Sequence, residues 1–178
     1  MTESTPIIRA LSPEEAHQHV ASLADILLDS VAGGASVSFM APLSPEDAQA
    51  FWRGIVKGVA ASKRALLIAE DPTTNQVQGT VQVILDQPEN QPHRADIAKM
   101  LVHRRARRQG LAAALMHGAE VAARAAGKTL LVLDTATGSD AERLYQRMGW
   151  NRVGIIPGYA LWPDGRPCAT TYYYKSLT

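Results

Sequence analysis

The 178-residue sequence has a single cysteine, Cys168, so one chain can form neither a disulfide framework nor a cysteine-ligated zinc site. It has no run of eighteen apolar residues, which argues against a transmembrane helix and a membrane partner. The N-terminal residues MTESTPIIRA lack the basic and apolar regions of a signal peptide. These absences together favour a protein of the reducing cytoplasm.

The sequence also lacks a large net charge, because 18 basic residues nearly balance 17 acidic ones. Hydrophobic residues make up 46% and charged residues 20%, which excludes disordered, collagen-like and coiled-coil proteins. The length favours one domain spanning residues 1–178. The charge is nevertheless uneven: residues 94–128 hold eight basic and two acidic residues, and four arginines fall within residues 104–108. Such a local excess indicates a binding site for a small anion.

Hydrophobic spacing and turn residues predict a mixed α/β domain in which antiparallel strands lead into a β-α-β unit. A helix start at Ser12, with Pro13 and Glu15 after it, opens a helix that continues to Val31. The other expected helices span residues 44–59, 110–126 and 139–148. Strands are expected at residues 7–11, 65–70, 77–86, 95–102, 130–134, 150–156 and 169–177.

The most specific local feature is the sequence RRQGLA at residues 107–112, between an expected strand and an expected helix. The first turn of a helix presents unpaired N–H groups and partial positive charge, and Gly110 lets a phosphate approach them. This arrangement suits a pyrophosphate, although the spacing matches neither the Walker nor the Rossmann motif. Two alternatives remain: a solvated arginine run, and a nucleic-acid patch at Arg104–Arg108. The lack of interleaved aromatic residues counts against the patch.

Residues 102–112, VHRRARRQGLA, resemble the coenzyme A pyrophosphate motif R/Q-x-x-G-x-G/A of the GNAT superfamily of N-acetyltransferases. The segment LYQRMGW at residues 144–150 resembles another conserved part of that superfamily. Longer pieces resemble the tabtoxin resistance acetyltransferases, which modify the amino group of an amino-acid toxin; they span residues 33–43, 93–102, 133–145 and 157–177. The resemblance implies the GNAT fold, a mixed α/β fold whose mainly antiparallel sheet contains a central splayed strand pair.

The resemblance implies acetyl-CoA as co-substrate, no metal, and a small-molecule primary amine as acceptor. A homodimer is plausible for this family. The cofactor-binding residues that it implies are Met100, Leu101, Val102, Arg107, Arg108, Gln109, Gly110, Leu111, Ala112 and Ala113. An oxyanion donor is expected among the backbone N–H groups near Leu101 or Val102. The family often has Asn where this chain has Gly138, so Ser139 or a water molecule is expected to take over that contact.

Three catalytic candidates follow from the same comparison. Asp134 ends the apolar stretch LLVLD at the carboxyl edge of the expected sheet, where ligands gather in α/β folds, and Asp96 precedes the arginine loop. The base is expected to be Asp96, Asp134 or a water molecule that relays the proton. Asp96 replaces a longer Glu of the family. Tyr145 is the expected acid. The alternatives are a turn carboxylate for Asp134, an ion-pair partner of Arg94 or Lys99 for Asp96, and a core aromatic for Tyr145.

Phe39, Met40 and Tyr159 are expected to form the acceptor-binding wall, with packing on the core or on a second subunit as the alternative. The main hypothesis is an N-acetyltransferase that moves acetyl directly to an amino-acid-like amine, with an antibiotic or toxin as one candidate substrate. No covalent enzyme intermediate is expected, because Cys168 has no assigned base. The rival hypotheses are a non-catalytic acyl-CoA-binding or regulatory module and a nucleic-acid-binding protein.

Overall fold

The computed structural model describes residues 5–178, so residues 1–4 of the N-terminal stretch considered above lie outside it. The chain folds into seven strands, five α-helices and one short 3-10 helix among these residues. In chain order these are β1 (Ile7–Ala10), α1 (Pro13–Gln18), α2 (Val20–Ala32), α3 (Pro45–Ala60), β2 (Arg64–Glu70), β3 (Val77–Ile84), β4 (Arg94–Val102), η1 (Arg104–Ala106), α4 (Leu111–Ala125), β5 (Leu130–Ala136), α5 (Asp140–Arg147), β6 (Asn151–Leu161) and β7 (Pro167–Ser176).

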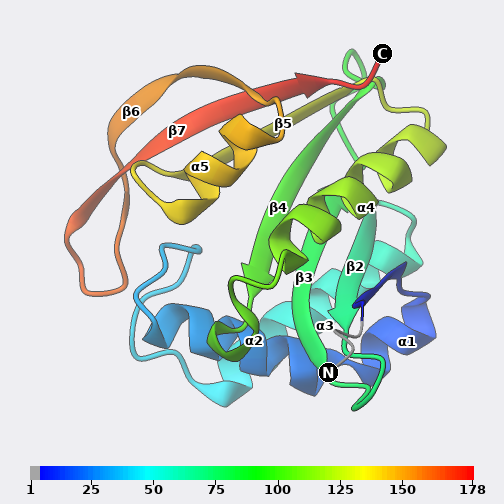
Figure 1. The fold of residues 1–178 in the computed structure, drawn as a ribbon, viewed down its shortest axis with the longest axis vertical. Coiled ribbons are helices and arrows are strands. Elements are labelled where there is room, and N and C mark those ends of the chain that lie inside the picture. The colour runs from blue at the N-terminus through cyan, green and yellow to red at the C-terminus, as the bar shows by residue number, and fades with distance from the viewer. Residues whose placement is uncertain (1–4) are drawn as a thin grey trace.

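The seven strands form one sheet in the order β1-β2-β3-β4-β5-β7-β6. Every neighbouring pair is antiparallel except β4 and β5, which run parallel and are joined through α4. That pair is hydrogen-bonded only from Arg94–Leu130 to Asp96–Val132. Beyond this point the two strands diverge, and Figure 1 shows them separating from a common upper end. The expected α/β fold with a central splayed strand pair is confirmed.

Helices cover both faces of the sheet, because the strands alternate apolar side chains between two cores. On β2, Leu67 packs in a cluster with Leu115 and Met116 of α4. Its neighbours Leu66 and Ile68 pack in the opposite cluster with α1, α2 and α3. Figure 1 shows α4 in front of the sheet and α2 and α3 along its lower end.

Several element boundaries differ from the expectation. The helix expected to run unbroken from Ser12 is interrupted at His19, which ends α1 and precedes α2. Its start is as predicted, since Ser12 and Glu15 form a complete capping box. β6 was expected to end at Ile156, before the turn-like Pro157; pairing with β7 instead resumes at Ala160 after an irregularity. None of the helices within residues 5–178 is long and apolar enough to cross a membrane.

Candidate active site

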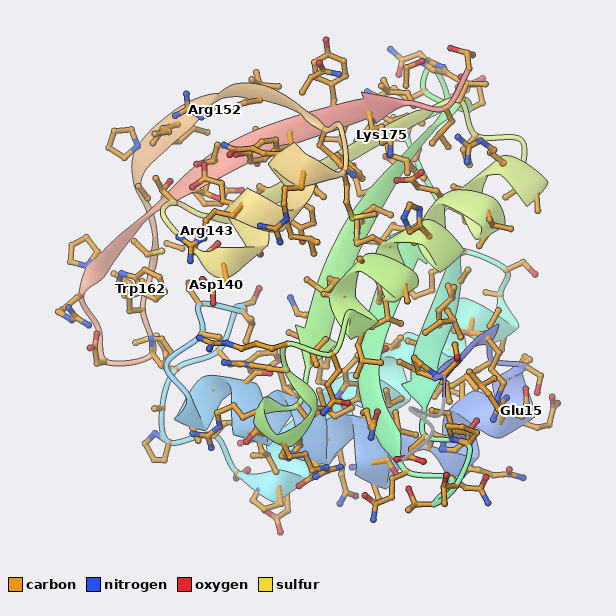
Figure 2. All side chains as sticks on the ribbon, in the orientation of Figure 1. Glu15, Asp140, Arg143, Arg152, Trp162 and Lys175 are labelled. Atoms are coloured by element: carbon orange, nitrogen blue, oxygen red, sulfur yellow. The ribbon has the colours of Figure 1, made fainter. Side chains whose placement is uncertain are left out.

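A large cleft opens where β4 and β5 separate. Its volume is about 1250 Å³, above the range of roughly 300–1,000 Å³ usual for a single small ligand. The walls come from the ends of β4 and β5, the start of α4, the helix α5, the α2–α3 loop and the β6–β7 hairpin. Among the residues of this region, Asp140 of α5 and Trp162 of the hairpin are labelled in Figure 2. The cleft therefore has room for two substrates.

The β4 side of the cleft is an open strand edge, where Arg107 Nε donates to the Val102 carbonyl at 3.4 Å. After Asp96, no strand in the described part of the chain pairs with β4 on the side that faces β5. Met100, Leu101 and Val102 all line the cleft on this stretch. An extended ligand that carries amide groups can therefore pair with β4 as an added strand.

The start of α4 has the features of an anion-binding helix terminus. Gly110 is the N-cap residue, with a left-handed φ of 77° and no side-chain cap, so the first-turn N–H groups have no capping side chain. A Cβ built on Gly110 meets no atom within 4 Å, so the space beside it is open. Arg107, Arg108 and Gly110 line the cleft, as do Leu111, Ala112 and Ala113. Gln109, although exposed, is not among the lining residues.

The other two arginines of the cluster are anchored to α2. The backbone N–H and Nε of Arg104 each donate to the Asp29 carboxylate at 2.8 Å. Arg105 lies 3.4 Å from the Asp25 carboxylate and donates to the Val77 carbonyl. Arg104 and Arg105 therefore hold the loop in place, while Arg107 and Arg108, the two arginines expected to bind the cofactor, line the cleft. This pairing leaves fewer guanidinium groups of the Arg104–Arg108 cluster for the phosphates of a nucleic acid, which counts against that hypothesis.

The carboxylate of Asp134 lies on β5 inside the cleft, where its residue is exposed. The Thr170 hydroxyl of β7 donates to Asp134 Oδ2 at 2.8 Å, which fixes the orientation of the carboxylate. Because β5 continues to Ala136, Asp134 does not end its strand as expected.

Tyr145 is both a core aromatic and a cleft residue. Its ring packs against Trp150 and Tyr173 with centroids 5.9 and 6.0 Å away, and the residue is only 5% exposed. It also lines the cleft, and its hydroxyl has no hydrogen-bond partner within residues 5–178. Burial, together with the negative charge of Asp134, raises the pKa of Tyr145 well above its ordinary value of 10.0. Tyr145 is therefore a protonated phenol at neutral pH.

Asp96 lies outside the cleft, at the point where β4 and β5 still pair. Its carboxylate forms an ion pair with Arg94 and accepts from Gln87 Nε2 at 3.1 Å. It is not among the residues that line the cleft. Its register partner Val132 is two residues before Asp134, so Asp96 and Asp134 share one face of the sheet.

The expected acceptor wall lies on the opposite rim. Phe39 packs edge-on against Phe51 of α3 with centroids 5.1 Å apart, so it contacts the core as well as the cleft. Met40 also lines the cleft and is 47% exposed. The Tyr159 hydroxyl lies 2.9 Å from the Tyr172 hydroxyl, and this contact, with some burial, raises the pKa of Tyr172 to about 12. The α2–α3 loop is tied to the hairpin by a hydrogen bond from the Ser36 hydroxyl to the Leu161 carbonyl, 2.9 Å long.

Several polar residues of the cleft cannot be found from the sequence alone, and two of them bear on the chemistry of the site. Lys99 of β4 reaches the cleft through a local irregularity of the strand, which periodicity does not reveal. Thr170 holds Asp134 from β7, far away in sequence, so only the pairing of β5 with β7 reveals it. Within residues 5–178 no group of three or more His, Cys, Asp or Glu residues is placed to hold a metal ion.

A family model described as the acetyltransferase (GNAT) family matches residues 21–150, which is most of the chain. The chain belongs to the GNAT family of acetyltransferases. This assignment makes the protein a GNAT N-acetyltransferase, so the enzyme hypothesis is confirmed at the level of the family.

Solved structures share the fold of this acetyltransferase at low sequence identity. An N-acetyltransferase from Staphylococcus aureus Mu50 has a TM-score of 0.79 and 18% identity, over 98% of this chain and 100% of that one. A ribosomal-protein-alanine N-acetyltransferase from Brucella melitensis has a TM-score of 0.80 and 19% identity, over 96% and 99%. The structure of yncA from Salmonella typhimurium with its cofactor acetyl-CoA has a TM-score of 0.78 and 17% identity, over 98% and 95%.

Proposed function

We propose that this enzyme moves acetyl from acetyl-CoA directly to the primary amine of a small amino-acid-like molecule. The observation that carries the proposal is that one cleft joins an uncapped helix start, flanked by two arginines, to the Asp134 carboxylate and the Tyr145 phenol. An anionic donor and a cationic acceptor therefore each meet complementary groups in the same space. A cytoplasmic location stays a prediction from the sequence.

The chain offers a fitting site for acetyl-CoA, which supplies an activated acetyl thioester when bound. Arg107, Arg108 and the first-turn N–H groups of α4 would bind the pyrophosphate, and Gly110 leaves space for it. The free edge of β4 from Met100 to Val102 would pair with the pantetheine amides. The structure of yncA with acetyl-CoA, which has the same fold, supports this assignment.

Asp134 is proposed as the base. Its carboxylate takes a proton from the acceptor ammonium, and the freed amine forms a C–N bond as the C–S bond of the thioester breaks. A backbone N–H near Leu101 or Val102 stabilises the oxyanion that develops on the carbonyl oxygen. The Tyr145 phenol then donates its proton to the departing thiolate, and the second proton that the nitrogen loses as the amide forms passes to the resulting phenolate. Direct transfer needs no nucleophile from the chain. Cys168 is buried, and its thiol donates a hydrogen bond to the Ala169 carbonyl.

Asp96 is proposed to receive a proton indirectly, after Asp134, rather than to take it from the amine. It lies on the same face of the sheet, yet Arg94 and Gln87 occupy its oxygens. A proton would have to reach it through water. Direct abstraction is therefore assigned to Asp134 alone.

Phe39, Met40 and Tyr159 are proposed to enclose the apolar part of the acceptor. The resemblance to the tabtoxin resistance acetyltransferases makes a toxin or antibiotic with a free amino group one candidate, and with it a role in resistance. Steady-state release of coenzyme A, measured over a panel of amino acids, dipeptides and amino-acid antibiotics, tests this. The product should be one acetyl group heavier by mass spectrometry. If acetyl-CoA binds but no acceptor gives turnover, the proposed function is wrong.

We also propose that β6 mediates contact with a second copy of this chain. β6 is one of the two edge strands of the sheet, and its residues Val153 and Ile155 are 67% and 42% exposed. A long exposed edge with apolar side chains is a template for pairing with an identical edge. Analytical ultracentrifugation should show a dimer that Val153→Asp dissociates; a wild-type monomer at all concentrations would refute it.

A further inference from the structure

The side chain of Lys99 reaches the cleft because β4 is irregular there. Thr80 pairs with Leu101 and Gln82 with Ala98, so Lys99 and Met100 together face only Val81. Such a bulge inserts one residue and reverses the faces of the strand beyond it. Lys99 adopts a left-handed φ of 49°, which is uncommon for a residue with a side chain.

The reversal moves Lys99 out of the α4 core. Ile97 packs in the α4 cluster. In a regular strand Lys99 and Leu101 would lie on the same face as Ile97 and would point into that cluster. Instead Leu101 packs in the cluster of α1 to α3. The Lys99 ammonium donates to the Ser38 hydroxyl at 3.0 Å and lies 5.8 Å from the centre of the Phe51 ring. Ser38 is itself left-handed, with a φ of 76°, so two unfavourable backbone conformations hold this one hydrogen bond.

The ammonium has no anionic partner of its own. Among the described residues no carboxylate forms an ion pair with it, and its one hydrogen-bond acceptor is the neutral Ser38 hydroxyl. Burial lowers the pKa of Lys99, and the charge of Asp134 opposes this shift. Half-buried charges are ordinarily paired, because desolvation is costly. Within residues 5–178 no such partner neutralises the Lys99 charge.

Lys99 and Asp134 line the same cleft from the two diverging strands, one positive and the other negative. Arg107 and Arg108 at the start of α4 would bind the pyrophosphate, so Lys99 is not needed for that group. We propose that Lys99 binds the carboxylate of the acceptor, while Asp134 receives its ammonium, so that the enzyme selects amines that also carry an anionic group. This inference rests on the proposed function and identifies the residue that makes the acceptor amino-acid-like.

The test compares each amino acid of the acceptor panel with its own carboxamide, which keeps the amine and the size but removes the negative charge. Wild-type enzyme should prefer the amino acid in kcat/KM. In Lys99→Met that preference should fall about 10- to 100-fold, the value of one charge-assisted hydrogen bond, mainly through KM. The matched control is Lys63→Met, which removes an exposed lysine paired with Asp86 and should keep the wild-type preference.

A charge-reversed variant keeps the proposal refutable if Lys99→Met folds poorly. Lys99→Glu should shift the preference toward diamines, which a merely structural lysine would not do. An equal loss for amino acids and carboxamides in Lys99→Met, or no preference in the wild type, overturns the role of Lys99 but leaves acetyl transfer intact. Absence of turnover with every amine, despite acetyl-CoA binding, instead overturns the proposed function and this inference with it.

Discussion

The glycine at the start of α4 allows the pyrophosphate site to be tested apart from folding. Gly110→Ala forces a side chain into a φ of 77°, and its Cβ would meet no protein atom within 4 Å. The cost to folding is therefore conformational, about 1–2 kcal/mol for the left-handed backbone. A gain of about 0.4–1 kcal/mol from the stiffer unfolded chain offsets part of it. The net loss should be roughly 1 kcal/mol, or a few degrees in Tm.

Binding should suffer more than folding in Gly110→Ala. The methyl group enters the open space beside the first-turn N–H groups, and one charge-assisted hydrogen bond to a phosphate is worth about 1.5–3 kcal/mol. The Kd for acetyl-CoA should therefore rise about 10- to 100-fold. Isothermal titration calorimetry measures the affinity, and urea unfolding measures the stability.

Gly127, just beyond the other end of α4, provides the matched control. Its φ is 73°, a Cβ there also meets nothing within 4 Å, and it does not line the cleft. Gly127→Ala should lose the same stability and keep the wild-type affinity for acetyl-CoA. Equal affinities in the two variants would refute the placement of the pyrophosphate at Gly110.

Two further predictions concern Tyr145 and Asp29. Tyr145→Phe should lower kcat about 10²- to 10⁴-fold with little change in Tm, since the hydroxyl has no hydrogen-bond partner within residues 5–178; an unchanged kcat would exclude it as the acid. Because its raised pKa keeps the phenol protonated, wild-type kcat at saturation should not decline as pH approaches 10.0. Asp29→Asn should cost about 1–3 kcal/mol in urea unfolding at neutral pH. Burial raises the pKa of Asp29, but its hydrogen bonds with Arg104 outweigh this effect and lower the pKa below 3.8 in the folded protein. The difference in stability between wild type and Asp29→Asn should therefore vanish as the pH falls through the pKa of the folded state. A difference that stays constant with pH would contradict the anchoring role.

The features that the sequence predicted well are those that neighbouring residues determine. The start of α1 follows from Ser12, Pro13 and Glu15, which form their capping box without help from distant residues. The turn at Gly110 follows in the same way from a glycine placed between arginines and a helix-forming segment. Both are local hydrogen-bond or backbone preferences, so the printed order of residues suffices to find them.

The features that it missed depend on strand pairing. The bulge that turns Lys99 toward the cleft arises from how β3 and β4 match, and the alternation of β4 alone places that lysine in the opposite core. Likewise, only the folded structure shows that Arg104 forms an ion pair with Asp29 on α2. The pairing of Asp96 with Arg94, two residues away, was one of the alternatives that the sequence left open.

The central claim is that the Asp134 carboxylate removes the proton from the acceptor amine. The most direct measurement is the rate of acetyl transfer by Asp134→Asn, with the acetyl-CoA affinity of the same variant. Asp140→Asn is its control, since Asp140 is a second carboxylate of the cleft, on its exposed rim and paired with Arg143. We predict a loss of about 10²- to 10⁴-fold in kcat for Asp134→Asn, with the acetyl-CoA affinity of that variant and the kcat of the control unchanged. Wild-type kcat in Asp134→Asn would contradict it.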